Sequence, residues 1–287
     1  MSPTEPSSQP ARAAKADRRA SSPAPPPTTS ESATVVAQSP VTVALLRAEL
    51  AIVITIAIGL SASRSVLRFL AAVTAPEPLS SQTATLNSSQ APGRPWIDLG
   101  LQLVFVVSLL LPVLLVLYLL RRSGDRLETV GLRADRLARD VLLGAGAAAG
   151  VGGVGLAGYL LARELGASLT LVPTSLPGVW WRIPVLLLAS FANAALEEVV
   201  LVGYLGRRCR QLGLSGPATV ALSAGLRGFY HLYQGLSGFL GNLAMGAIFA
   251  SYFHRTGRIV PLVVAHTLID VVAFVGYLLI SPHVGWI

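Results

Sequence analysis

The chain has 287 residues, of which 53% are hydrophobic and only 13% are charged. An ordinary soluble domain carries about 25% charged residues, so the composition excludes that class. The net charge of +8 comes almost wholly from arginine, because Lys15 is the single lysine. The arginines lie mostly between long apolar runs. This distribution is typical of a membrane protein that follows the positive-inside rule and gives no indication of nucleic-acid binding.

The N-terminal segment, residues 1–40, is rich in proline, serine, alanine and threonine and contains no aromatic residue. Such a composition cannot bury enough apolar surface to fold, so we predict a disordered cytoplasmic tail. Residues 41–287 are predicted to form the transmembrane domain.

Seven apolar runs follow, each about as long as a bilayer-spanning helix requires. They predict an all-α polytopic membrane bundle of seven to eight transmembrane helices, at about 43–73, 98–120, 139–162, 181–205, 216–235, 236–254 and 259–280. The third run is dense in glycine at 144–158, which favours a tightly packed membrane helix. Loops after the second, fourth and sixth runs are rich in arginine, and the others are not. This alternation predicts a multi-pass protein of the cell membrane with a cytoplasmic N-terminus.

Ionisable side chains inside the apolar runs are candidates for function, because burying them in a bilayer is costly. They gather in the last third of the chain, where four-residue steps put several of them on one helix face. The set is Glu197, Glu198, Arg227, His231, His266 and Asp270, with Asn193 and Asn242 as polar companions. Three helices would each present one polar face, which predicts a single polar pocket where these faces meet.

Such a pocket suits hydrolysis of an amide bond. A carboxylate can take a proton from water as general base. Two histidines can bind a metal or hold the water and the substrate carbonyl, and Asp270 could orient His266. Since Glu197 and Glu198 are about 100° apart on a helix, we expect one to face the reaction and the other to pair with a cation.

Each feature also has a structural interpretation. Glu197 and Glu198 could pair with Arg227 merely to join helices. His231 could be an interfacial histidine between Tyr230 and Tyr233, and His266 with Asp270 could form a helix–helix hydrogen bond. The coincidence of all three features favours function.

Three motifs resemble those of one family: EEVVLVGYL, LRGFYHLYQG and HTLID. They resemble the EExxxR, FxxxH and HxxxN/D motifs of the CPBP family, also called Abi, of CAAX-protease and bacteriocin-processing intramembrane proteases. Type II CAAX prenyl endopeptidases belong to it. The resemblance covers about residues 180–275, the protease-like core. It implies that Glu197 activates water with Glu198 in support, and that His231, His266 and Asp270 complete the catalytic set. It leaves open whether a divalent metal such as zinc takes part.

Two positions depart from the family pattern. Val202 stands where the first motif has arginine, and Arg227 stands where the second has an aromatic residue. We hypothesise that Arg227 supplies the missing charge by pairing with Glu198. The run 216–235 also poses a problem of depth. If it crossed the whole bilayer, His231 would lie on the order of 15 Å from Glu197, so that run is expected to be tilted, or short and re-entrant.

The sequence therefore predicts an intramembrane endopeptidase whose pocket opens toward the cytoplasmic side. Its partners would be the bilayer and a membrane-associated or lipidated peptide or protein. One alternative is a non-catalytic immunity or scaffold protein of the same fold. Another is a proton- or metal-coupled transporter that uses the same glutamates and histidines.

Overall fold

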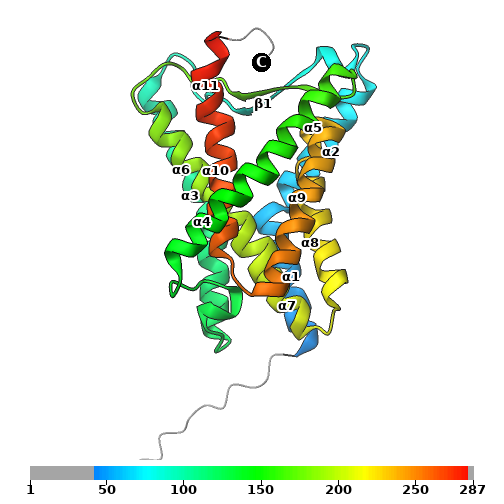
Figure 1. Cartoon of the computed structure of the whole chain (residues 1–287), viewed down its shortest axis with the longest axis vertical. Coiled ribbons are helices and arrows are strands. Elements are labelled where there is room, and N and C mark those ends of the chain that lie inside the picture. The colour runs from blue at the N-terminus through cyan, green and yellow to red at the C-terminus, as the bar shows by residue number, and fades with distance from the viewer. Residues whose placement is uncertain (1–41, 284–287) are drawn as a thin grey trace, which may run out of the picture. The chain divides into compact units, whose positions relative to one another are not determined.

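The computed structural model describes residues 42–283 (Figure 1). These belong to the second of two units into which the chain divides, Met1–Pro40 and Val41–Ile287. The predicted disordered tail lies outside the described residues.

The described part is an all-α bundle, as predicted, and it also contains one small sheet that was not predicted. Its α-helices are α1 Val43–Ile54, α2 Leu60–Thr74, α3 Pro95–Arg122, α4 Leu137–Ala147, α5 Gly153–Glu164, α6 Arg182–Ala195, α7 Leu205–Gln211, α8 Gly216–Tyr230, α9 Gly235–Thr256, α10 Val260–Val271 and α11 Tyr277–Ile280. Four π-helical segments join some of these into longer helices: η1 Thr55–Gly59, η4 Ala148–Gly152, η5 Leu196–Tyr204 and η7 Val272–Gly276. Short 3₁₀ turns occur at Leu79–Ser81, Leu127–Val130, Leu232–Gln234 (η6) and Ser281–His283.

Within residues 42–283, six helices are long and apolar enough to span a membrane. The run 216–235, expected as a seventh, is not among them. Its helix α8 has 15 residues and is only about 22 Å long, less than the roughly 30 Å of a bilayer core. The backbone leaves the helix at His231, and Gly235 adopts a positive φ of 88° before α9 begins. The chain is a multi-pass membrane protein whose fifth apolar segment is a short helix.

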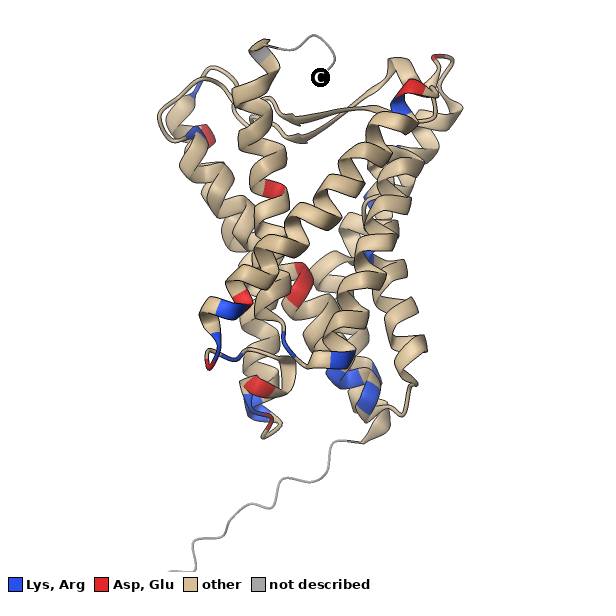
Figure 2. Ribbon diagram, in the orientation of Figure 1, with Lys and Arg blue, Asp and Glu red and all other residues tan. Residues whose placement is uncertain are grey.

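The two ends of the bundle differ in charge and in structure. Strands β1 Thr83–Asn87 and β2 Thr170–Thr174 pair in parallel at one end, which we call the strand end. The arginine-rich loops meet at the other, where α1 begins (Figures 1 and 2), and we call it the arginine end. Ion pairs join these loops: Arg207 with Asp125, and Arg258 with Asp140, at 2.6 Å each. The predicted alternation of loops between the two ends is confirmed.

Small residues of the third span hold α10 in place. Gly144 lies so close to α10 that a Cβ atom there would be 2.7 Å from Val264, and one at Gly152 would be 3.2 Å from Ile269. Ala148, midway between these glycines, packs on the same core cluster as α10. Five other glycines of this span have open space around them, so the expected tight packing applies to one face only. That face fixes the helix that carries His266.

Candidate active site

The two glutamates lie in a π-helical segment in the most buried span. In the 30-residue helix Arg182–Gln211, 78% of the most apolar window is buried, against 6% for Leu137–Glu164. Segment η5 begins one residue before Glu197, and both glutamate side chains are fully buried. A π-helical turn is wider than an α-helical one and is frequently found at functional sites. The wider turn lets both carboxylates reach one partner, as the structural interpretation of these glutamates had it.

That partner is Arg227 on α8. Its Nη2 donates a hydrogen bond to Glu198 Oε1, and its Nε lies 3.2 Å from Glu197 Oε2 without the alignment of a hydrogen bond. The guanidinium is fully buried and lies over the ring of Phe249, 5.5 Å from the centroid. Val202 packs in the same cluster as Phe249. The hypothesised pair of Arg227 with Glu198 is thus present, and it lies close to the position where the family has its arginine.

Helix α10 brings His266 and Asp270 to the same place. His266 Nδ1 lies 2.8 Å from Glu198 Oε1, and His266 Nε2 lies 3.8 Å from Asp270 Oδ1. Asn193 Nδ2 donates to Asp270 Oδ2 at 3.1 Å, so the polar faces of α6 and α10 are joined. Glu198 therefore contacts both a cation and a histidine, and its supporting role in catalysis stays a prediction.

His231 faces the other glutamate. It caps the end of α8, where its Nδ1 lies 3.0 Å from the carbonyl oxygen of Arg227. A carbonyl only accepts, so Nδ1 carries the proton and donates it. The other ring nitrogen, Nε2, lies 3.8 Å from Glu197 Oε1, beyond a direct hydrogen bond. Glu197 and His231 thus form one side of the site, and Glu198 with His266 forms the other.

The short helix removes the difficulty of depth. Glu197 lies 14 residues before the end of α7 and His231 lies 15 residues after the start of α8, and only the four residues 212–215 separate these two ends. At 1.5 Å per residue, both side chains stand about 21–22 Å from the arginine end. The expected mismatch arose from assuming that the fifth run crosses the whole bilayer. The short alternative is the correct one.

Some buried polar atoms of the site have hydrogen-bond partners and others have none. Both carboxylate oxygens of Glu197, Oε2 of Glu198, and Nε and Nη1 of Arg227 have no hydrogen-bond partner among the described residues. Native proteins pair nearly all buried polar atoms, so a cluster of unpaired atoms calls for an explanation, and a binding or catalytic role is one. The unpaired atoms concentrate on the side of the site where Glu197 faces His231.

The described residues do not gather a metal-binding set. No group of three or more His, Cys, Asp and Glu side chains in residues 42–283 is arranged to hold a metal ion. Glu197 and His231 face each other as a pair, while His266 is turned to Glu198 and the positive charge of Arg227 lies beside both carboxylates. This arrangement does not fit a metal centre, and no chemical step is assigned to one. Participation of a divalent metal stays a prediction.

One expectation about the site needs correction. Asn242 does not join it: its amide donates to the carbonyl of Gly238, one turn earlier in α9. The predicted opening toward the cytoplasmic side stays a prediction. The side chains of Val202, Phe249 and Phe253 are buried together in one core cluster. On the strand side, Asn193 is half-buried and the Asp270 side chain is 15% exposed. The less buried side of the site thus faces the strand end.

The sequence argument missed one polar contributor. Tyr230 donates a hydrogen bond from its hydroxyl to Asn193 Oδ1 at 3.2 Å, and its ring lies 4.3 Å from that of His231. Together with the Asn193–Asp270 bond, this contact links α8, α6 and α10 across the site. The sequence shows that Tyr230 is next to His231. It does not show that α8 ends here, which is what allows both side chains to face the pocket.

Comparison with protein families gives one match. The sequence model of the family "Type II CAAX prenyl endopeptidase Rce1-like" matches residues 179–272, about a third of the chain. The matched segment runs from just before α6 to the start of η7 and contains every site residue named above. Asn242 also lies within the matched segment, although it is not part of the site. Comparisons with curated proteins and with solved structures found no match. Residues 179–272 of this multi-pass membrane protein thus match the family of type II CAAX prenyl endopeptidases, which supports its assignment to the CAAX proteases.

Proposed function

We propose that the chain is an intramembrane endopeptidase in which Glu197 is the general base. The observation that carries this proposal is the pair of unpaired, fully buried oxygens of Glu197, 3.8 Å from His231 Nε2. That separation is too long for a direct hydrogen bond and short enough for one water to bond to both groups. The family match supports a protease in general, and the mechanism below is our proposal.

In this mechanism a water bound between Glu197 and His231 attacks the carbonyl carbon of the substrate. Glu197 takes the proton from the water and then delivers it to the leaving amide nitrogen. His231 Nε2, whose ring is fixed by the bond from Nδ1 to the Arg227 carbonyl, orients the water. Fixing the water with its lone pairs directed at the carbonyl lowers the activation barrier of the attack, because the two reactants are already oriented toward each other.

The other half of the site would position these groups. Glu198 holds Arg227 and His266, and Asn193 holds Asp270, so the polar side chains of three helices are fixed relative to one another. In the proposal, His266 lies where the carbonyl oxygen of the substrate develops negative charge, and Asp270, 3.8 Å from its Nε2, orients its ring. The substrate class is a membrane-associated or lipidated peptide or protein, which enters from the less buried strand side.

The test is proteolysis by the purified full-length protein in liposomes, with a mixed set of membrane-associated peptides, some of them lipidated. Wild type would be compared with Glu197→Gln and His231→Ala, and with Glu128→Gln as a matched control on the exposed Glu128 of the arginine end. Cleavage by wild type and the control, and its loss in both site variants, is the expected result. Equal cleavage by all four proteins would overturn the proposal. Absence of cleavage by folded wild type would favour the non-catalytic immunity or scaffold function.

A further inference from the structure

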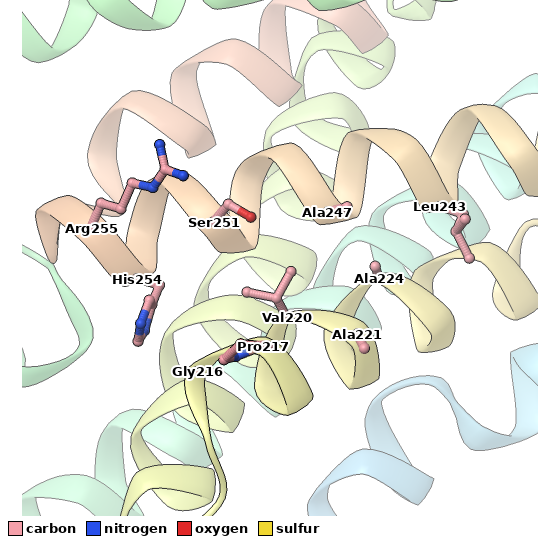
Figure 3. Close-up of a pocket in the computed structure, with 10 residues that line it drawn as sticks. All are labelled: Gly216, Pro217, Val220, Ala221, Ala224, Leu243, Ala247, Ser251, His254 and Arg255. Carbon is pink, nitrogen blue, oxygen red and sulfur yellow. The ribbon is translucent and has the colours of Figure 1, made fainter.

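A groove runs between α8 and α9. It has a volume of about 610 Å³ and its walls are small and apolar, with Val220, Ala221 and Ala224 on α8 and Leu243 and Ala247 on α9 (Figure 3). On each helix the lining residues recur at four-residue steps, so each wall is one helix face. From Leu243 to Arg255 the groove is about 18 Å long, at 1.5 Å per residue. These dimensions suit one extended hydrocarbon chain.

One end of the groove is polar and positively charged. Ser251, His254 and Arg255 of α9 line it, and across from them lies the N-terminus of α8 at Gly216 and Pro217 (Figure 3). The first backbone N–H groups of a helix and its dipole favour a negative charge at this position. The polar end is therefore built for an anion, while the remainder is built for a hydrocarbon.

The arginines at this end of the bundle are not all engaged in ion pairs. Arg207, Arg208 and Arg258 each pair with aspartate or glutamate. Arg255, which lines the groove, forms no ion pair with any residue in 42–283. Its charge is therefore available at the polar end of the groove.

We propose that this groove binds an anionic phospholipid, with one acyl chain between α8 and α9 and the phosphate at Arg255 and His254. The position fits a bilayer, because the polar end of the groove lies at the arginine end of the bundle and the apolar part runs toward its middle. A juxtamembrane arginine attracts anionic lipids by about fivefold in affinity, so Arg255 predicts a preference of about that size over a zwitterionic lipid.

The bound chain would also touch the wall of the active site. Ala224 lines the groove one helical turn before Arg227, and a Cβ atom on Gly246 would lie 3.0 Å from Ala224 and 3.2 Å from the Arg227 side chain. The groove and the buried guanidinium are therefore separated by a single layer of packed residues. Lipid binding is expected to stabilise the pairing of α8 with α9 and, through it, the position of Arg227.

The experiment is native mass spectrometry of the full-length protein with phosphatidylglycerol or phosphatidylcholine added in the same detergent. It does not depend on cleavage, so it stands whether or not the protein is a protease. Three variants are compared: Arg255→Gln at the polar end, Ala247→Leu within the groove, and Arg121→Gln as a control on an exposed arginine of the same end. Thermal unfolding without lipid confirms that each variant is folded.

Wild type and Arg121→Gln are expected to retain one phosphatidylglycerol in preference to phosphatidylcholine. Arg255→Gln should lose about fivefold of that preference, and Ala247→Leu should lose the bound lipid of both kinds. Equal retention of the two lipids by wild type would overturn the proposal. So would an equal loss in Arg255→Gln and Arg121→Gln, which would mean that general charge attracts the lipid, or unchanged retention in a folded Ala247→Leu.

Discussion

Two buried arginines of this molecule make a direct comparison. Arg208, at the arginine end, uses all three of its guanidinium nitrogens: Nε bonds to Glu49, Nη1 to Asp125 and Gln211, and Nη2 to Ser123. Arg227, at mid-bundle, hydrogen-bonds through Nη2 alone. Both are at most 1% exposed. The same residue type, equally buried, is completely satisfied in one cluster and mostly unsatisfied in the other.

Under the proposed function, the difference is that between a structural cluster and a functional one. The Arg208 cluster joins α1, α7 and the loop after α3, and the hydroxyl of Tyr204 adds a bond to Glu49 at 2.6 Å. Nothing in it is left to bind a further molecule. The Arg227 cluster leaves both Glu197 oxygens available. Proteins tend to break rules of local consistency at functional sites and satisfy them elsewhere.

The largest expected effect is on cleavage. Glu197→Gln keeps the shape of the side chain and removes the base, so cleavage should fall by about 10²–10⁴-fold. The change also removes a buried charge whose oxygens accept no hydrogen bond, and it leaves Arg227 paired with Glu198, so the midpoint of thermal unfolding should be unchanged or higher. Both quantities are measured on the same purified sample. A clear fall in the unfolding midpoint would mean that Glu197 is a structural residue like Glu49.

The next effect is on stability. Arg227→Ala leaves Glu197 and Glu198 buried without a cation and should lower the free energy of unfolding by about 3–5 kcal/mol, measured by chemical denaturation in detergent. Because Val202 and Arg227 share Phe249 as neighbour, Val202→Arg should restore part of that loss.

Two controls show whether charge is the cause. The neutral triple variant Arg227→Met, Glu197→Gln, Glu198→Gln removes the cation and both anions together, and should recover most of the stability that Arg227→Ala loses. If neither this variant nor Val202→Arg improves on Arg227→Ala, the arginine acts by filling space, and the idea that it replaces the family arginine fails.

The comparison is sharpest at Arg208. Arg208→Ala should cost about 3 kcal/mol in unfolding free energy, because Glu49 and Asp125 lose their partner. Cleavage per folded molecule should not change, since no part of this cluster approaches the Glu197 side of the site. The exposed Arg122→Ala is the matched control and should alter neither quantity. A loss of cleavage in folded Arg208→Ala would erase the distinction between the two clusters.

The smallest effect concerns pH. Asp135 is exposed, and its hydrogen bond to Arg258 lowers its pKa below the usual value. A carboxyl whose pKa is lower in the folded state stabilises the fold above its unfolded pKa of about 4 and loses that contribution as the pH falls further. Asp135→Asn should therefore have a slightly lower unfolding midpoint at pH 7, with the difference from wild type shrinking toward pH 3. A difference in unfolding midpoint that stays the same from pH 7 to pH 3 would contradict this prediction.

The sequence predicts much of the site because its signals are local and chemical. Ionisable residues in apolar runs are few, and steps of four place them on helix faces, so the convergence of Asn193, Glu198, Arg227, His266 and Asp270 could be anticipated. The pairing of Arg227 with Glu198 followed from a missing charge at Val202 and an added one on the next helix.

Other features depend on geometry that composition does not encode. The run 216–235 is apolar enough for a span, and only the break at His231 shows that α8 stops at mid-bundle. Strands β1 and β2 lie in polar loops with no alternating pattern long enough to reveal them. Which side of the site is less buried depends on packing between distant helices, as in the cluster that holds Phe249 and Phe253.

The wide turn of η5 affects how the Arg227 cluster and the Arg208 cluster are oriented relative to each other around one helix. Glu197 and Glu198 lie at its beginning, and Arg208 follows four residues after its end, all on one continuous helix. Rewinding the nine residues of η5 as ordinary α-helix, with the sequence unchanged, would rotate everything downstream, because an α-helical residue turns about 100° and a residue of the wider π-helix turns less. Either Glu197 and Glu198 or Arg208 would then face away from its partners. The π-helical segment thus sets the relative orientation of Glu197 and Glu198 and of Arg208 around one helix, so that each set faces its own partners.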